Sequence, residues 1–282
     1  MKKRILALLL VGVLALLGLT GCGGTGGETT DPSGTSGNTD PENSLPTLPS
    51  TKTKLIVGFD ADFPPMGFRD TDGKFTGFDL DLAEEVAKRL NVEIVKQDII
   101  WDNKDNELEA GTIDMIWNGF TISEARKTEY EWTRPYMNNK QVVVVEKDSA
   151  YQTLADLAGK KVAIQGGSTA VDAVAANPAF KDSITLVEVK DNLKALMELQ
   201  TGATEAVAMD LIVADYTMTK NPDKYRILDE VLLTEVYGVG FLKGNTDLRD
   251  VVQACLDAMY TDGTFKTISE KWFGHDVLIP QQ

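Results

Sequence analysis

Few side chains of this sequence could bind a transition metal or serve as a nucleophile with its base. The 282 residues include one histidine, His275, and two cysteines, Cys22 and Cys255. A zinc site made of four cysteines, or of two cysteines and two histidines, is therefore impossible. A Ser-His-Asp triad could form only around His275, near the C-terminus. We expect no metal site, no cofactor and no disulfide framework.

Three charged residues instead follow short runs of strand-forming residues. Asp60 comes after the first run, Arg126 lies just past a later one, and Asp210 follows residues 206–209. Ligands of open α/β sheets bind at the carboxyl ends of the strands. A guanidinium can hold a carboxylate through two parallel hydrogen bonds, and a carboxylate can hold a cation. These residues are therefore candidates for binding a charged ligand.

Two of these residues also have simpler structural interpretations. Arg126 could pair with Glu124 or Glu129 on a solvated face. Asp210 could cap the helix that is predicted from Leu211, and this role is compatible with ligand binding. The residue pattern alone leaves these alternatives open.

The elements that must position these residues alternate between strand and helix from residue 54 onwards, which is typical of an α/β fold with a mainly parallel sheet. Strands are predicted at residues 55–58, 92–95, 113–117, 141–146, 162–165, 184–189, 206–209 and 236–241. Helices are predicted at residues 79–90, 105–110, 154–158, 169–176 and 191–201, from 211, and at 248–260 and 264–272. Asp81 and Glu84 have the spacing of a capping box, Asp191 is a predicted N-cap, and a short helix is expected from Ser123. Because the pattern restarts after about residue 145, we predict two lobes.

The N-terminal residues are not expected to belong to the fold. A basic start is followed by about fifteen apolar residues, fewer than the roughly 20 of a membrane-spanning helix but typical of a signal peptide. The end of this stretch, Leu19-Thr20-Gly21-Cys22, resembles a bacterial lipobox. By that resemblance, residues 1–21 are a lipoprotein signal peptide and Cys22 carries a lipid; the alternative is a plain signal peptide with an incidental cysteine. Residues 22–53 are nearly free of apolar side chains, which predicts a flexible tether.

The charge balance excludes a nucleic-acid partner. The chain has 28 Lys+Arg against 43 Asp+Glu, a formal net charge of −15 at pH 7. Binding to DNA requires a basic surface, and no run of Lys and Arg could supply one. After cleavage at Cys22, Cys255 would be the remaining thiol, and we expect it to be buried and unreactive on the helix at 248–260.

Six segments, in order along the chain, resemble those of the periplasmic-type solute-binding proteins of polar amino-acid ABC importers, family 3. They are Val57-Gly58-Phe59-Asp60-Ala61-Asp62-Phe63-Pro64-Pro65, Gly77-Phe78-Asp79-Leu80-Asp81-Leu82-Ala83, Asp114-Met115-Ile116-Trp117-Asn118-Gly119-Phe120-Thr121-Ile122-Ser123-Glu124-Ala125-Arg126-Lys127, Gly159-Lys160-Lys161-Val162-Ala163, Gly166-Gly167-Ser168-Thr169 and Lys271-Trp272-Phe273-Gly274. The resemblance runs from Lys54 to about Gly274. It implies the two-lobe type II fold of periplasmic binding proteins, with two hinge crossings. Lobe 1 would comprise residues 54–139 and 240–282, lobe 2 residues 140–239, with crossings near Asn139-Lys140-Gln141 and Val236-Tyr237-Gly238.

The resemblance also implies a set of ligand-binding residues. They are Asp60, Phe63, Trp101, Asn118, Gly119, Thr121, Arg126, Gln165, Ser168, Thr169 and Asp210. Arg126 would hold the carboxylate of an α-amino acid, with Thr121 and Thr169 as further donors. Asp210 would hold the ammonium, and Phe63 and Trp101 would enclose the side chain.

Specificity would come from Asp60, Asn118 and Gln165, with Asp79 and Asp102 as further candidates. Asp60 suits a cationic or amide side chain, and a glutamate ligand would face an uncompensated carboxylate. Gln165 stands where glutamine binders of the family tend to have lysine, which favours a cationic or other large polar amino acid. Gly67 stands where the family often has an acidic residue.

The resulting prediction is an extracytoplasmic receptor of an ABC importer. It would be anchored by lipid at Cys22 to the outer face of the bacterial cell membrane. As a monomer without cofactor, it would close on a polar L-amino acid and deliver it to a membrane permease. The alternatives are an enzyme on the same scaffold, similar to a cyclohexadienyl dehydratase, for which Asp60 is the one acid–base candidate, and an amino-acid sensor domain.

Overall fold

The β-branched runs of the sequence form one long mixed sheet. In the computed structural model, which describes residues 45–281, its strand order is β10-β9-β11-β8-β12-β6-β1-β5. These strands are β1 (Lys54–Phe59), β5 (Glu93–Asp98), β6 (Met115–Thr121), β8 (Met137–Glu146), β9 (Lys161–Gln165), β10 (Thr185–Val189), β11 (Ala206–Asp210) and β12 (Tyr225–Leu242). Strand β7 (Tyr130–Trp132) pairs with β12 beside this order, and β2 (Asp62–Phe63), β3 (Gly67–Arg69) and β4 (Phe75–Thr76) form a small second sheet. Strands β6 and β11 are buried at every position, because both of their faces are covered.

Helices cover the faces of the main sheet. They are α1 (Phe78–Arg89), α2 (Lys104–Glu109), α3 (Thr169–Ala175), α4 (Pro178–Lys181), α5 (Asn192–Gln200), α6 (Leu211–Lys220), α7 (Thr246–Asp262) and α8 (Thr264–Phe273). The apolar stripes that periodicity predicts are buried, as with Leu82, Ala83, Val86 and Ala87 of α1. The α/β fold predicted from the sequence is confirmed.

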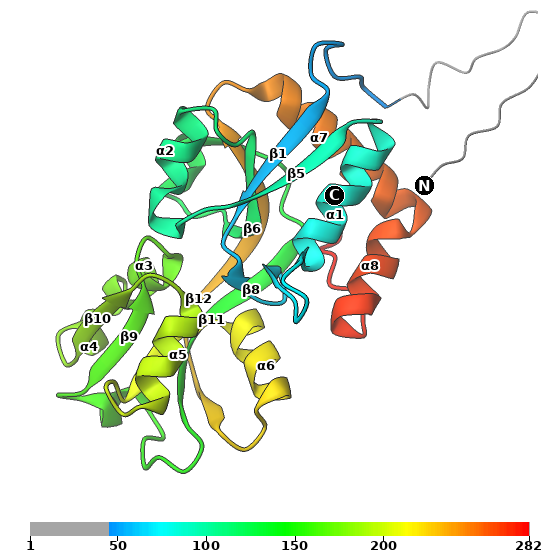
Figure 1. Cartoon of the computed structure of the whole chain (residues 1–282). Helices are drawn as coiled ribbons and strands as arrows, with labels where there is room; N and C mark the ends of the chain where they lie inside the picture. Colours follow the sequence, from blue (N-terminus) through cyan, green and yellow to red (C-terminus); the bar gives the residue numbers. More distant parts are fainter. Residues whose placement is uncertain (1–44, 282) are drawn as a thin grey trace, which may run out of the picture. The chain divides into compact units, whose positions relative to one another are not determined.

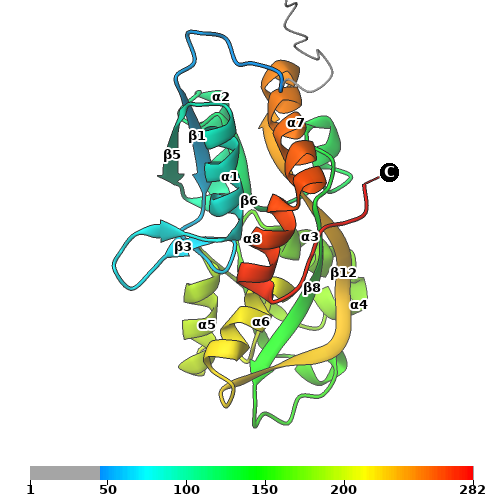
Figure 2. The same cartoon turned by 90° about the vertical axis from the view of Figure 1, so that its right-hand side faces the viewer.

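Strands β8 and β12 run between two groups of elements (Figures 1 and 2). The first group contains β1, β5, β6, α1, α2, α7 and α8, and the second contains β9, β10, β11 and α3 to α6. Strand β8 pairs with β11 of the second group, and β12 pairs with β6 of the first. The two strands also pair with each other, with Glu235 opposite Asn139. Both groups are therefore joined through this antiparallel pair.

Several local predictions are confirmed. The side chain of Asp191 caps α5 by accepting a hydrogen bond from the backbone N–H of Lys194 at 2.6 Å. Cys255 is buried on α7, and burial raises the pKa of its thiol to about 11.

Other local predictions are wrong. Helix α1 begins at Phe78 with Gly77 at its N-cap and no side-chain cap, so Asp81 and Glu84 do not form a capping box. Asp81 instead accepts hydrogen bonds from Trp272 Nε1 at 2.7 Å and from Lys271 Nζ at 2.6 Å, which attach α8 to α1. Strand β12 begins at Tyr225 rather than at residue 236.

Residues 45–53, which the sequence predicts as part of the tether, lie against the first group. Leu45 and Leu48 pack against the hydrophobic core, and Lys52 forms an ion pair with Asp114 at 2.6 Å. The signal-peptide and lipidation predictions, including Cys22, and the rest of the tether lie outside the described residues.

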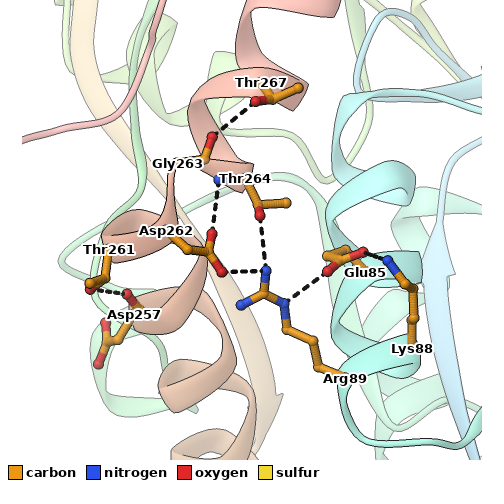
Figure 3. Close-up of polar contacts among 9 residues, drawn as sticks. All are labelled: Glu85, Lys88, Arg89, Asp257, Thr261, Asp262, Gly263, Thr264 and Thr267. Carbon is orange, nitrogen blue, oxygen red and sulfur yellow. Dashed lines mark hydrogen bonds and ion pairs between the residues drawn. The ribbon is translucent and has the colours of Figure 1, made fainter.

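Arg89, at the end of α1, is bonded to the junction between α7 and α8 (Figure 3). Its guanidinium donates to Glu85 Oε1 at 2.9 Å, to Asp262 Oδ2 at 2.8 Å and to Thr264 Oγ1 at 2.9 Å. The backbone N–H of Thr264 donates in turn to the Asp262 carboxylate at 2.9 Å. This side chain therefore connects three helices of the first group.

Candidate functional site

Arg126 follows β6 on a single 3₁₀ turn, Arg126–Thr128, so the helix expected from Ser123 is wrong. The turn is held by hydrogen bonds from Arg126 N to Ser123 Oγ at 3.3 Å and from Trp132 Nε1 to Arg126 O at 3.1 Å. Arg126 is 9% exposed, and its guanidinium lies over the ring of Phe120, 4.9 Å from the ring centroid. Its Nη2 donates to the carbonyl oxygen of Gly167 at 2.9 Å, in the second group. Pairing with Glu124 or Glu129 does not occur in the structure; Glu124 pairs with Lys127.

Two threonines, one from each group, meet beside the contact between Arg126 and Gly167. Thr121 ends β6, and Thr169 begins α3, as predicted, with Ser168 at the N-cap. Thr169 Oγ1 donates to Thr121 Oγ1 at 3.2 Å, and both side chains are buried. Gln141 of β8 donates to Thr169 Oγ1 at 3.3 Å. Hydroxyl and guanidinium donors thus converge where β6 and α3 meet.

Asp210 ends β11 and stands at the N-cap position of α6, but its side chain makes no capping hydrogen bond. Its Oδ1 accepts from Asn139 Nδ2 at 2.8 Å, Gln141 Nε2 at 2.9 Å and the hydroxyl of Tyr237 at 2.6 Å. Burial, followed by the neighbouring charge of Glu235, raises the pKa of Asp210 to about 8. Sequence reasoning missed Glu235 and the amides that join it to Asp210.

Asp60 lies directly after β1, as predicted, and is 5% exposed. Its Oδ2 accepts from Gln165 Nε2 at 2.7 Å, across the two groups. Gln165 Oε1 in turn accepts from Asn192 Nδ2 at 3.0 Å. Burial, with smaller contributions from Asp62 and Asp191, raises the pKa of Asp60 to about 6. This carboxyl group is suited to a hydrogen-bond donor or a cation.

Asn118 and Gly67 lie behind Asp60. Asn118 Oδ1 accepts from the backbone N–H of Asp60 at 3.1 Å, which positions the Asp60 backbone. A Cβ at Gly67 would lie 2.7 Å from Asn118 Nδ2, so a larger residue there would require Asn118 to move. The acidic residue that the family often has at this position would therefore not fit without rearrangement.

The two predicted aromatic walls lie in different surroundings. Phe63 packs against Gly119, where a Cβ would come within 2.9 Å of the ring; Gly119 has a φ of 55°. Trp101 stacks edge-on against Phe120, with ring centroids 5.5 Å apart, and Lys104 lies over its ring. The structure gives no contact between Phe63 and Trp101.

Three further predicted residues have structural partners. Asp79 is fully buried within the first group and accepts from the Gly119 N–H at 2.6 Å and from the Tyr136 hydroxyl at 2.8 Å. Ser168 Oγ donates to the carbonyl oxygen of Gln165 at 2.8 Å. Asp102 is exposed and lies against Gly167, where a Cβ would be 2.7 Å from its Oδ1.

Sequence reasoning also missed Lys104, whose side chain is buried at the same interface. Its Nζ approaches the Gly167 carbonyl oxygen at 3.4 Å. Burial, followed by the neighbouring charge of Arg126, lowers the pKa of Lys104. Its place between Trp101 and a predicted helix could have marked it as a candidate, because lysine is unusual in a buried position.

The chemistry of these residues is that of recognition. A buried guanidinium with hydroxyl donors can bind a carboxylate, and carboxyl groups on two sides can bind an ammonium and a polar side chain. Among residues 45–281, no cluster of three or more His, Cys, Asp or Glu side chains could hold a metal ion. In the same part of the chain, no helix combines the length and the apolar character needed to cross a membrane.

Comparisons with known proteins identify the family of this chain. Residues 55–275 match the family of bacterial extracellular solute-binding proteins, family 3. The L-cystine-binding protein TcyJ of Escherichia coli K12 is 33% identical over 225 residues, 79% of this chain and 84% of that protein.

Two solved structures are similar over most of their length. The substrate-binding protein of an ABC uptake transporter from Streptococcus pneumoniae, with bound histidine, is 33% identical with a TM-score of 0.79, covering 82% of this chain and 96% of that one. An ancestral arginine-binding protein bound to arginine is 37% identical with a TM-score of 0.74, covering 79% and 99%. The predicted family is one of binding proteins rather than enzymes, and the match spans more than half of the sequence. The chain belongs to the bacterial extracellular solute-binding proteins of family 3.

Proposed function

We propose that this protein binds a polar L-α-amino acid outside the cytoplasm and delivers it to the permease of an ABC importer. The observation that carries the proposal is the convergence of Arg126 and Thr121 from the first group with Thr169 and Asp210 from the second. The names of the relatives support it, because they bind cystine, histidine and arginine. An α-amino acid has a carboxylate and an ammonium on one carbon, and this arrangement offers a partner for each.

The α-carboxylate binds Arg126, with Thr121, Thr169 and Ser168 as neighbouring donors. The buried guanidinium points across the interface to Gly167 and forms no ion pair within residues 45–281, so its charge is available to a ligand anion. Because the site is buried, the charge-assisted hydrogen bonds are stronger than they would be in water.

The side chain of the ligand extends between Phe63 and Trp101, past Gly119, towards Asp60, Asn118 and Gln165. Asp60 has acidic neighbours in Asp62 and Asp191, so this end of the site favours a donor or a positive charge. Arginine, lysine, glutamine and histidine meet this requirement, whereas glutamate places a second carboxylate beside Asp60.

The two element groups act as lobes. Lobe 1 is residues 54–139 and 240–282, lobe 2 is residues 140–239, and the hinge lies in β8 and β12. Hydrogen bonds between the lobes, from Gln165 to Asp60 and from Arg126 to Gly167, support a closed arrangement. The ligand stabilises closure because neither lobe alone supplies its complete shell.

The mature protein is a monomer held at the outer face of the cell membrane by a lipid on Cys22. A tether of about twenty residues spans on the order of 25 Å, so the receptor stays within reach of a membrane permease. The lipobox resemblance at residues 19–22 supports this anchor.

A ligand screen tests the proposal. We expect one or a few polar L-amino acids to raise the melting temperature of the protein in a thermal-shift screen of the twenty amino acids and cystine. Calorimetry should then show that Arg126→Ala reduces affinity at least about 100-fold, since a buried charge-assisted contact contributes about 3 kcal/mol. Lys127→Ala, an exposed neighbour, is the control. Affinity of Arg126→Ala within threefold of the unmodified protein would contradict the proposal.

A further inference from the structure

The carboxyl group of Glu235 lies beside that of Asp210, although neither the sequence nor the roles proposed above assign it a function. Glu235 Oε1 accepts from Asn139 Nδ2 at 2.7 Å and from Gln141 Nε2 at 2.9 Å. The same two amide nitrogens donate to Asp210 Oδ1. Glu235 is 7% exposed and Asp210 5%, so two carboxyl groups share one pair of donors in a buried site.

This network has more acceptors than donors. Glu235 Oε2 and Gln141 Oε1 are buried and have no hydrogen-bond partner among residues 45–281. Gln141 Nε2 is already close to three acceptors, which are Asp210 Oδ1, Glu235 Oε1 and Thr169 Oγ1. Buried polar atoms are nearly always hydrogen-bonded, so the network lacks donors. A group with several N–H bonds and a positive charge would satisfy it.

The position of the network indicates that the missing donor is the ammonium of the ligand. Asp210 and Glu235, called the acid pair below, are linked by hydrogen bonds to the region proposed for the α-carboxylate. The link runs through Gln141, which contacts Thr169, and from Thr169 to Thr121. The ammonium of an α-amino acid is one carbon away from its carboxylate. It therefore brings three N–H donors and one positive charge to the place where both are missing.

We propose that Glu235 is a second carboxylate of the ammonium subsite, and that the ammonium of the ligand replaces a proton that Glu235 and Asp210 share. This inference rests on the proposed function. No covalent bond changes: the proton passes from the carboxyl pair to the solvent, and the ammonium keeps its own protons.

Within residues 45–281, neither Asp210 nor Glu235 forms a salt bridge with a cation. The Tyr237 hydroxyl donates to Asp210, and burial together with Asp210 raises its pKa well above the ordinary value, so it stays neutral. A cavity of about 520 Å³ is lined by Glu235 and also by Glu124 and Lys127, which pair with each other at the surface. Two adjacent buried carboxylates cannot both be ionised without a cation, so one proton is retained.

The raised pKa of Asp210, about 8, agrees with this arrangement. Below that pH the pair holds its proton, and the ammonium must displace it. Affinity therefore rises with pH between 6 and 8, by at most about tenfold per unit for one released proton. Asp60, with a pKa of about 6, is mostly ionised above pH 7, so measurements between pH 7.0 and 7.5 isolate the acid pair.

The test measures the number of protons that the protein releases when it binds a ligand. The full chain is titrated at pH 7.2 with L-arginine, or with L-glutamine if arginine gives no thermal shift, in buffers of different ionisation enthalpy. We expect about one proton to be released per ligand bound. Glu235→Gln keeps the shape of the side chain and should release less than half as many protons, with affinity that changes little between pH 6 and 8. Glu146→Gln, an exposed carboxyl on β8, is the matched control and should behave like the unmodified protein.

Release of no proton by the unmodified protein, or equal release by Glu235→Gln, would overturn the inference. If Glu235→Gln does not fold, as judged by circular dichroism, Asp210→Asn gives the same test, and proton release that persists in it counts against the acid pair. Binding without proton release refutes only the role of Glu235. Failure of the amino-acid screen at every pH between 5 and 9 refutes the proposed function itself.

Discussion

Asp79 is a buried carboxyl group of the first group, and it accepts a hydrogen bond from Gly119, a residue of the proposed site. Burial raises its pKa to about 7, although Gly119 and Tyr136 both donate to it. Its unfolded pKa is near 3.9, so between these values the folded state binds more protons than the unfolded state, and stability decreases as pH rises through this range. We expect the melting temperature to increase from pH 8 to pH 5 and Asp79→Asn to weaken that dependence. A pH profile of Asp79→Asn equal to that of the unmodified protein would contradict this role.

The sequence predicts some site residues and not others for physical reasons. Asp60 directly follows β1 and Asp210 is the last residue of β11, so their positions at the strand ends are predictable from the residue pattern. Arg126 depends on the family resemblance, because the predicted helix around it is only one turn. Glu235 could not be identified, because its proximity to Asp210 arises from pairing between strands distant in sequence.

Helix α1 is held against α7 and α8 through Arg89 (Figure 3). Its side chain is 15% exposed and bonds to Glu85, Asp262 and Thr264. We expect Arg89→Ala to lower the free energy of unfolding by about 1–3 kcal/mol, because it removes the hydrogen bonds that join α1 to Asp262 and Thr264. Ligand affinity should not change, because Arg89 bonds to Glu85, Asp262 and Thr264, none of which is a proposed site residue.

Lys88→Ala is the matched control for Arg89. Lys88 also pairs with Glu85 but is 77% exposed, so its removal should cost about 0–0.5 kcal/mol. Urea denaturation of both variants measures the difference. If the two variants are equally stable, Arg89 does not stabilise the packing of α1 against α7 and α8.

At the level of elements, strands with continuous apolar runs were predictable, and β12 was not. Its first half, from Tyr225 to Glu235, is partly exposed and pairs with β8 through register shifts, so neither an apolar run nor strict alternation marks it. The tether boundary was wrong for a related reason. Isolated side chains such as Leu45 and Leu48 give no periodic signal, yet they pack against the core.

For the molecule as a whole, the hinge that we propose in β8 and β12 predicts a change of shape on binding. We expect the radius of gyration of a variant that starts at residue 45 to decrease when the ligand saturates it, because the ligand favours the closed lobes. Small-angle scattering measures this, with Arg126→Ala as the control that should show no decrease. Calorimetric binding without any change in the radius of gyration would contradict closure.

In the complex that we propose, one α-carbon presents its carboxylate to Arg126 and its ammonium to Asp210. The most direct measurement is calorimetry with three related ligands: the amino acid that gives the largest thermal shift, the amine that lacks its carboxylate, and the acid that lacks its ammonium. We expect each analogue to bind at least about 100-fold more weakly, because each leaves a buried charged group unpaired. If either analogue binds within threefold of the amino acid, the corresponding subsite does not exist as described.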